Sequence, residues 1–208
     1  MGINMRCFPC GMLGTNCYVI YNENKNAIII DLEEESDALT DFVLENKLDV
    51  KMILLTHPHF DHMRGIMEMK KITGAKVLVC KDAVEYDENG NAFVKHGLKK
   101  VLGQIVPDEY FADGDVLYLD NTPIEIFVGN GHSKADAVFK IGDNLFTGDA
   151  LFHGTIGRTD LENGDYDSLV KFVRGLKRFG EDTKVYPGHG ESTTIGNEMK
   201  INKYMMGD

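Results

Sequence analysis

The sequence predicts a layered α/β protein with the order helix–sheet–sheet–helix. Three observations support this fold class. Short apolar runs rich in Ile, Val, Leu and Tyr alternate with amphipathic segments along all 208 residues. This texture occurs in both halves, each with strands followed by helices. No long linker, low-complexity tract or repeat interrupts it, so we expect one domain over residues 1–208.

The first half is predicted to hold four strands and two helices. The strands are expected where β-branched and aromatic residues concentrate, at residues 17–21, 27–31, 51–56 and 76–80. Ser36 can cap a helix that runs to about Asn46, because an apolar face at helical spacing follows it. A second helix is expected over residues 63–72, ending before Gly74.

The second half repeats this organisation. Its strands are expected at residues 116–119, 124–128, 137–141, 144–147 and 184–186. Gly142 and Asp143 provide a tight hairpin turn between two of them. Asp165 can cap a helix over residues 166–178, and a last helix is expected over residues 191–205.

Composition excludes several classes of protein. Lys and Arg total 22 against 33 for Asp and Glu, and this net charge of −11 disfavours a nucleic-acid partner. No apolar run reaches the length of a membrane span, and the N-terminus lacks a secretory pattern, so a cytoplasmic protein is expected. In that compartment its four cysteines are expected to be reduced and to serve in packing: Cys7, Cys10, Cys17 and Cys80.

The most informative segment is 56–62, Thr-His-Pro-His-Phe-Asp-His, which directly follows a predicted strand. Three imidazoles and a carboxylate are ligand types that zinc and related ions accept. On a tight loop, His57 and His59 could share one ion, and Asp61 and His62 could serve a second. The alternative is a polar loop with solvated histidines.

Further ligand types follow other predicted strands. His132 lies in Gly-His-Ser, His189 lies in Pro-Gly-His-Gly, and Asp149 follows Gly148 at the end of a strand. Ligands delivered by several strand-end loops are typical of a metal centre on a rigid scaffold. This convergence favours the metal site over solvated histidines. His96 and His153 are expected to have no such role; the alternative for His153, near Asp149, is that it lines the active-site cleft.

The ordered motifs His-x-His-x-Asp-His, Gly-His, Gly-Asp and Pro-Gly-His-Gly resemble those of the metallo-β-lactamase superfamily. The resemblance extends from Thr15 to Gly190, and residues 147–152, 157–160 and 186–190 make it most similar to short glyoxalase II-like hydrolases. It implies a four-layer αββα sandwich with the active site along one edge. It also implies two divalent ions, expected to be zinc, with iron or manganese as alternatives. The implied ligands are His57, His59 and His132 for the first ion, Asp61, His62 and His189 for the second, and Asp149 between them.

The implied activity is hydrolysis of a small-molecule thioester, similar to S-lactoylglutathione, by a metal-bound hydroxide. Asp61 would orient that hydroxide or accept its proton. Arg158 is implied to bind substrate, and the alternative is that it pairs with Asp160. Other activities compatible with these residues are an iron-dependent persulfide dioxygenase, a lactonase and a metal-binding module without turnover.

Two features depart from the family pattern. After His132 the chain has Ser-Lys-Ala-Asp in place of a Pro-Gly-Ser type of turn, so Lys134 and Asp136 are expected to alter substrate access or the contacts behind the ligands. About 18 residues follow Gly190, so the helical domain with which longer glyoxalase II enzymes hold glutathione is not expected.

Overall fold

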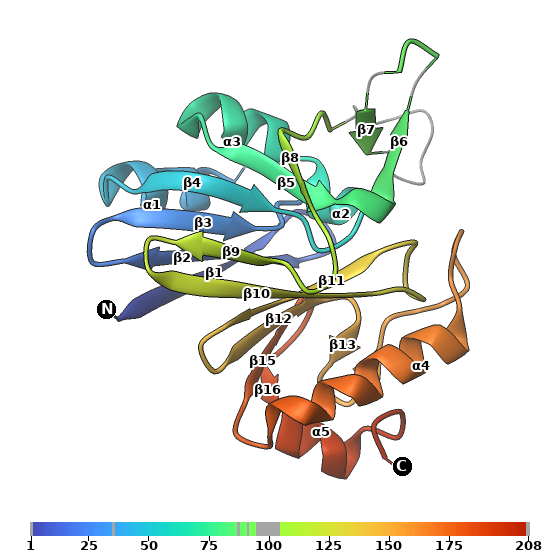
Figure 1. The fold of residues 1–208 in the computed structure, drawn as a ribbon. Helices are drawn as coiled ribbons and strands as arrows, with labels where there is room; N and C mark the ends of the chain where they lie inside the picture. Colours follow the sequence, from blue (N-terminus) through green and yellow to red (C-terminus); the bar gives the residue numbers. More distant parts are fainter. Residues whose placement is uncertain (1, 35, 87, 91, 95–104, 207–208) are drawn as a thin grey trace.

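Two six-stranded sheets pack face to face, and helices cover the outer face of each sheet (Figure 1). The computed structural model describes residues 2–34, 36–86, 88–90, 92–94 and 105–206. The predicted helix–sheet–sheet–helix sandwich is confirmed. His96 lies outside the described residues.

The first sheet is antiparallel between its first three strands and parallel beyond them. In spatial order it contains β1 (Ile3–Cys10), β2 (Thr15–Asn22), β3 (Asn26–Ile30), β4 (Asp49–Leu54), β5 (Lys76–Cys80) and β8 (Glu109–Phe111). Its helices are α1 (Asp37–Glu45), α2 (Phe60–Met63) and α3 (Ile66–Thr73). A 3-10 turn, η1 (Lys81–Ala83), leads into a small hairpin of β6 (Val84–Tyr86) and β7 (Ala92–Val94).

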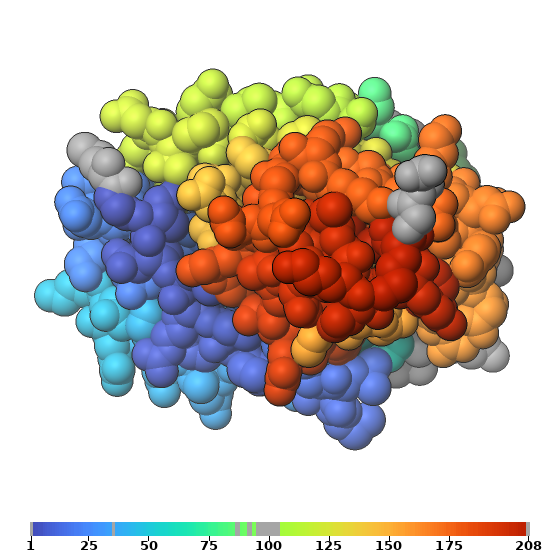
Figure 2. All heavy atoms as spheres, turned by 90° about the horizontal axis from the view of Figure 1, so that it is seen from below, coloured from blue at the N-terminus to red at the C-terminus, as the bar shows by residue number. Residues whose placement is uncertain are grey.

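The second sheet is antiparallel except where β12 and β15 run side by side. In spatial order it contains β16 (Thr193–Thr194), β15 (Lys184–Pro187), β12 (Asn144–Gly148), β11 (Asp136–Ile141), β10 (Thr122–Gly129) and β9 (Val116–Leu119). A hairpin of β13 (Leu151–Phe152) and β14 (Thr155–Ile156) follows β12. The outer layer contains α4 (Tyr166–Gly175), η2 (Leu176–Phe179) and α5 (Ile195–Ile201), whose orange and red atoms cover the centre of the face in Figure 2.

Apolar side chains fill all three spaces between the four layers. The alternation within β3 shows why: Ile28 and Ile30 face the second sheet, while Ala27 and Ile29 face the helices of the first layer. This Ile-rich strand is therefore buried on both faces. Beneath the second sheet, Leu169 and Val173 of α4 pack into the third cluster.

Some predicted elements differ from those observed. Cys7 and Cys10 lie within β1 and not before the first strand. This edge strand is half-exposed and contains Pro9, which an edge strand tolerates because one side of its backbone needs no partner. The C-terminal helix is shorter than the predicted 191–205, because Thr194 caps its start and accepts a hydrogen bond from the backbone N–H of Asn197.

The predicted helix over residues 63–72 is divided into α2 and α3. The division falls at Gly65, whose backbone N–H donates to the carbonyl of Leu32. A Cβ at Gly65 would lie 2.7 Å from the backbone of Glu34, so the chain approaches its neighbour too closely for a side chain. Because α2 begins at Phe60, the second part of the histidine-rich segment is helical and not a loop.

Hydrogen bonds between distant segments close one end of the sandwich. The backbone N–H of Ala137 donates to the carbonyl of Thr56, which links the two sheets at 2.8 Å. The backbone N–H of Asn16 donates to the carbonyl of Gly188, and its side-chain amide donates to the carbonyls of Pro187 and Gly190. The loops that carry the ligand-type residues are thereby held at the same edge.

Candidate metal centre

The structure brings together all seven residues that the sequence analysis selected as metal ligands. His57 and His59 follow β4, and His59 occupies the N-cap position of α2. The other five come from α2 and from the ends of β10, β12 and β15: Asp61, His62, His132, Asp149 and His189. Because the turn of α2 replaces a loop, Asp61 and His62 project from a helix and His57 and His59 from the segment before it.

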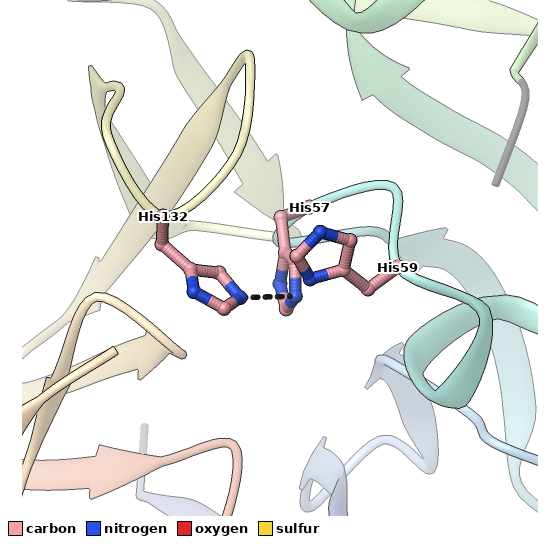
Figure 3. Close-up of side chains that lie close together, drawn as sticks. All are labelled: His57, His59 and His132. Atoms are coloured by element: carbon pink, nitrogen blue, oxygen red, sulfur yellow. Dashed lines mark hydrogen bonds between the residues drawn. The ribbon is translucent and has the colours of Figure 1, made fainter. Parts of the chain in front are cut away.

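The ligand atoms form two triads joined by a third group. His57, His59 and His132 place their ligand nitrogens within 4.8 Å of one another, and Figure 3 shows their three rings turned inward. Asp61, His62 and His189 form a second group of the same kind. The third combines His57, His62 and Asp149, so Asp149 lies between the two triads.

The closest nitrogens are placed as a metal ion requires. Nε2 of His57 lies 3.2 Å from Nε2 of His132, the contact drawn as a dashed line in Figure 3. The Nδ1–H of His132 donates to the carbonyl oxygen of Arg158 at 2.9 Å, which leaves Nε2 with a lone pair when the ring is neutral. Facing lone pairs repel unless a cation lies between them. A tetrahedral zinc ion separates neighbouring nitrogen ligands by about 3.3 Å, so the spacing fits this group.

Asp31 is a functional residue that the sequence analysis missed. It follows β3 and is buried, and its Oδ2 accepts hydrogen bonds from Thr56 Oγ1 and from His62 Nδ1, both at 2.7 Å. The Thr56 hydroxyl in turn accepts from Nδ1 of His57 at 3.0 Å. One carboxylate therefore fixes the tautomer of a histidine in each triad, with Nε2 directed into the centre.

The carboxylate of Asp149 lies close to Gly188 and among three of the histidines. Its Oδ1 atom is buried and makes no hydrogen bond within the described residues, although Nε2 of His62 lies 3.3 Å away. Its Oδ2 lies 3.5 Å from Nε2 of His132 and 3.6 Å from Nε2 of His189. A Cβ at Gly188 would lie 2.3 Å from Oδ1. An orphaned buried carboxylate oxygen among imidazoles is a second feature that fits a bound cation.

Burial and neighbouring charges shift the pKa values of the ligand residues. Burial lowers the pKa of His57 well below its usual range and that of His59 to about 4, so both rings are neutral at pH 7. Burial disfavours charge on His62 as well, but the carboxylates of Asp149 and Asp31 outweigh it and raise its pKa. Burial likewise opposes ionisation of Asp149, yet the surrounding histidines hold its pKa at about 2. Burial also opposes charge on His189, but its hydrogen bond to Asp61 and the charge of Asp149 raise its pKa. An incoming ion thus meets neutral rings at His57 and His59 and the carboxylate of Asp149, and it competes with protons at His62 and His189.

Arg158 and the two N-terminal cysteines lie apart from this arrangement. The guanidinium of Arg158 is exposed and makes two hydrogen bonds of 2.7 Å to the carboxylate of Asp160. This is the pairing named as the alternative, and substrate binding by Arg158 stays a prediction. Cys7 is exposed, Cys10 is buried, and both are free thiols.

Residues 10–189 match the metallo-beta-lactamase superfamily. The chain belongs to this superfamily. It is 34% identical to the hydroxyacylglutathione hydrolase GloC of Haemophilus influenzae, over 98% of each chain. This similarity supports the predicted glyoxalase II-like branch. None of the helices in the described part of the chain has the length and apolar character needed to cross a bilayer.

Two solved structures extend the comparison. The fold superposes on the crystal structure of the B3 metallo-beta-lactamase BLEG-1 with a TM-score of 0.87, 30% identity and coverage of 98% of this chain and 100% of that one. It also resembles TTHA1623 in a di-iron-bound form, with a TM-score of 0.79, 26% identity and coverage of 96% and 99%.

Proposed function

We propose that this protein is a binuclear metal-dependent hydrolase that cleaves the thioester bond of an S-hydroxyacylglutathione-like substrate. The observation that carries the hydrolase assignment is the pair of ligand triads with Asp149 between them. The full-length similarity to a hydroxyacylglutathione hydrolase supports the choice of a thioester.

His57, His59 and His132 would hold one ion, Asp61, His62 and His189 would hold the other, and Asp149 would contact both. We expect zinc, with iron or manganese as alternatives, because imidazole and carboxylate donors accept all three. When bound, such a pair of ions supplies Lewis acidity and an acidified water molecule for attack on the substrate carbonyl.

The chain's own residues orient this chemistry. Burial opposes ionisation of Asp61, but a hydrogen bond from His189, with Nε2 3.1 Å from Oδ2, contributes to lowering the pKa of this carboxyl. Asp61 is therefore ionised at neutral pH and can accept a hydrogen bond or a proton from the attacking water. Asp31 and Thr56 hold the rings of His62 and His57, so these ligands need little reorganisation. A contact between substrate and Arg158 would require its guanidinium to leave Asp160.

Two other activities are supported by specific observations. The similarity to BLEG-1, described as a B3 metallo-beta-lactamase, favours β-lactam hydrolysis as a second candidate. A persulfide dioxygenase would use one iron held by His57, His132 and Asp149. These residues are adjacent: Nε2 of His132 lies 3.2 Å from Nε2 of His57 and 3.5 Å from Oδ2 of Asp149.

The decisive experiment is hydrolysis of S-D-lactoylglutathione by zinc-reconstituted protein. We expect turnover by the wild type, loss of turnover in His59→Ala and wild-type turnover in His153→Ala, which alters a histidine outside the triads. Absence of turnover by protein that has taken up two equivalents of zinc would contradict the thioesterase assignment. Turnover of nitrocefin, of a lactone, or of a persulfide with oxygen uptake by iron-loaded protein would identify the alternatives. Uptake of metal without turnover of any of these substrates would indicate a metal-binding module without enzymatic activity.

A further inference from the structure

Lys134 is exposed on a loop that is otherwise buried. Every other residue of the segment 131–139, including His132 and its neighbour Ser133, is buried. Lys134 therefore brings a flexible cationic side chain to the surface two residues after a residue of the first triad. The corresponding turn differs from the Pro-Gly-Ser type expected from the resemblance, so this is a feature of this chain.

Asp136 fixes the backbone of this loop. Its buried carboxylate accepts hydrogen bonds from the backbone N–H groups of His132 and Ser133, at 2.9 and 3.0 Å, and from Ser133 Oγ at 2.5 Å. The backbone N–H of Ala135 donates to the same hydroxyl oxygen at 3.2 Å. Because its neighbours on both sides are held, Lys134 starts from a fixed position beside His132.

The ammonium group of Lys134 is available to a ligand. Within the described ranges, no hydrogen bond or ion pair involves the side chain of Lys134, whereas the guanidinium of Arg158 is already bound to Asp160. The whole chain carries a net charge of −11, which repels anions. A cation beside the centre counteracts this repulsion locally.

We propose that Lys134 binds a carboxylate of the substrate at the rim of the metal centre. The proposal rests on the proposed function and adds the residue that recognises a carboxylate of the substrate. A lysine suits this task because its ammonium is a point charge on a flexible stem that accepts carboxylates at varied positions.

The test compares Lys134→Met, which removes the charge but keeps the length, with Lys134→Arg, which restores it. Lys171→Met is the matched control, an exposed lysine on α4. Each zinc-loaded protein is assayed with S-D-lactoylglutathione and with its diethyl ester, in which both carboxylates are masked.

We expect Lys134→Met to raise KM for the acid form about fivefold, the upper range of an exposed ion pair. The kcat, the KM for the ester and the thermal midpoint should stay unchanged. Lys134→Arg should recover most of the loss, and 0.5 M NaCl should shrink it.

A binding measurement separates this proposal from the proposed function. Calorimetric titration with S-hexylglutathione and its diethyl ester reports anion recognition without turnover. A wild-type preference for the acid form that Lys134→Met abolishes would support the site even if no thioester is hydrolysed. No such preference in the wild type, an equal loss for acid and ester, or the same loss in Lys171→Met would overturn it.

Discussion

Replacing Asp31 by Asn is expected to weaken metal binding while leaving the fold intact. Asn is nearly isosteric with Asp and tolerates the positive φ of 56° at this position. Its oxygen can still accept from the backbone N–H of Thr56, which now bonds to Oδ1 at 2.8 Å. The NH2 group of the new side chain, however, would take the place of Oδ2 and would face two hydrogen-bond donors, the hydroxyl of Thr56 and Nδ1–H of His62.

Both donors must then become acceptors. His62 moves its proton to Nε2, and the turned hydroxyl of Thr56 forces the same exchange on His57. Each triad loses one lone pair, so the affinity for both ions should fall about 10- to 100-fold, or about 1.4–2.8 kcal/mol per ion. The exchange of two charge-assisted hydrogen bonds for neutral ones should cost about 1–2 kcal/mol of unfolding free energy.

Zinc affinity is measured by competition with a chromophoric chelator, and stability by thermal unfolding of the metal-free protein. Thr56→Val serves as the matched variant, since it cuts only the branch to His57 and should weaken only the first ion. If the Asp31→Asn protein binds two zinc ions as tightly as the wild type, the assignment of tautomers through this carboxylate is refuted.

Three further outcomes are expected. Gly188→Ala should lower the unfolding free energy of the metal-free protein by about 1–3 kcal/mol, because the added methyl group would clash with Oδ1 of Asp149. An unchanged thermal midpoint would contradict this prediction. The ion of the first triad should stay bound as pH falls through 6.5 and leave near pH 4–5, because the pKa of His59 is lowered to about 4. The ion of the second triad should leave at higher pH, because the pKa values of His62 and His189 are raised and protons compete there first; loss of half of the first ion at pH 6.5, or release of both ions together, measured by zinc content after dialysis, would disagree. Glu198→Gln should lower the unfolding free energy by about 2–3 kcal/mol in chemical denaturation, because this fully buried carboxylate joins α5 to the β13–β14 hairpin. Glu191→Gln, which alters an exposed carboxylate, should have little effect on the unfolding free energy. The number of zinc ions bound should not change in either protein.

The candidate site could be predicted from the types of its residues and from their positions after expected strands. Five of the seven histidines belong to the site, and His57, His132 and His189 all follow apolar runs long enough to be recognised as strands. Strand ends in a layered fold gather at a common edge, so the sequence order alone brings these residues together.

Asp31 could not be recognised in the same way. Its partners are 25 and 31 residues further along the chain, and their contact depends on how α2 docks against the end of β3. The only local signal is an acidic residue directly after a strand that is buried on both faces. Likewise, β1 escaped prediction because an exposed edge strand with Pro9 lacks a continuous apolar run. The division at Gly65 depended on a backbone approach to Glu34 that no local pattern records.

The hydrogen bonds of Asn16 have a consequence for the order in which the protein matures. They join the beginning of the chain to Pro187 and Gly190, across 171 and 174 residues. His189, in turn, lies 127 residues beyond its partner His62. During synthesis the first triad is complete once His132 has emerged, but the second cannot close until β15, which precedes His189, docks against β2. Contacts of such long range form late and slowly in folding. Occupancy by two ions therefore requires that synthesis has passed His189, and a chain terminated before this residue is left with an incomplete second triad.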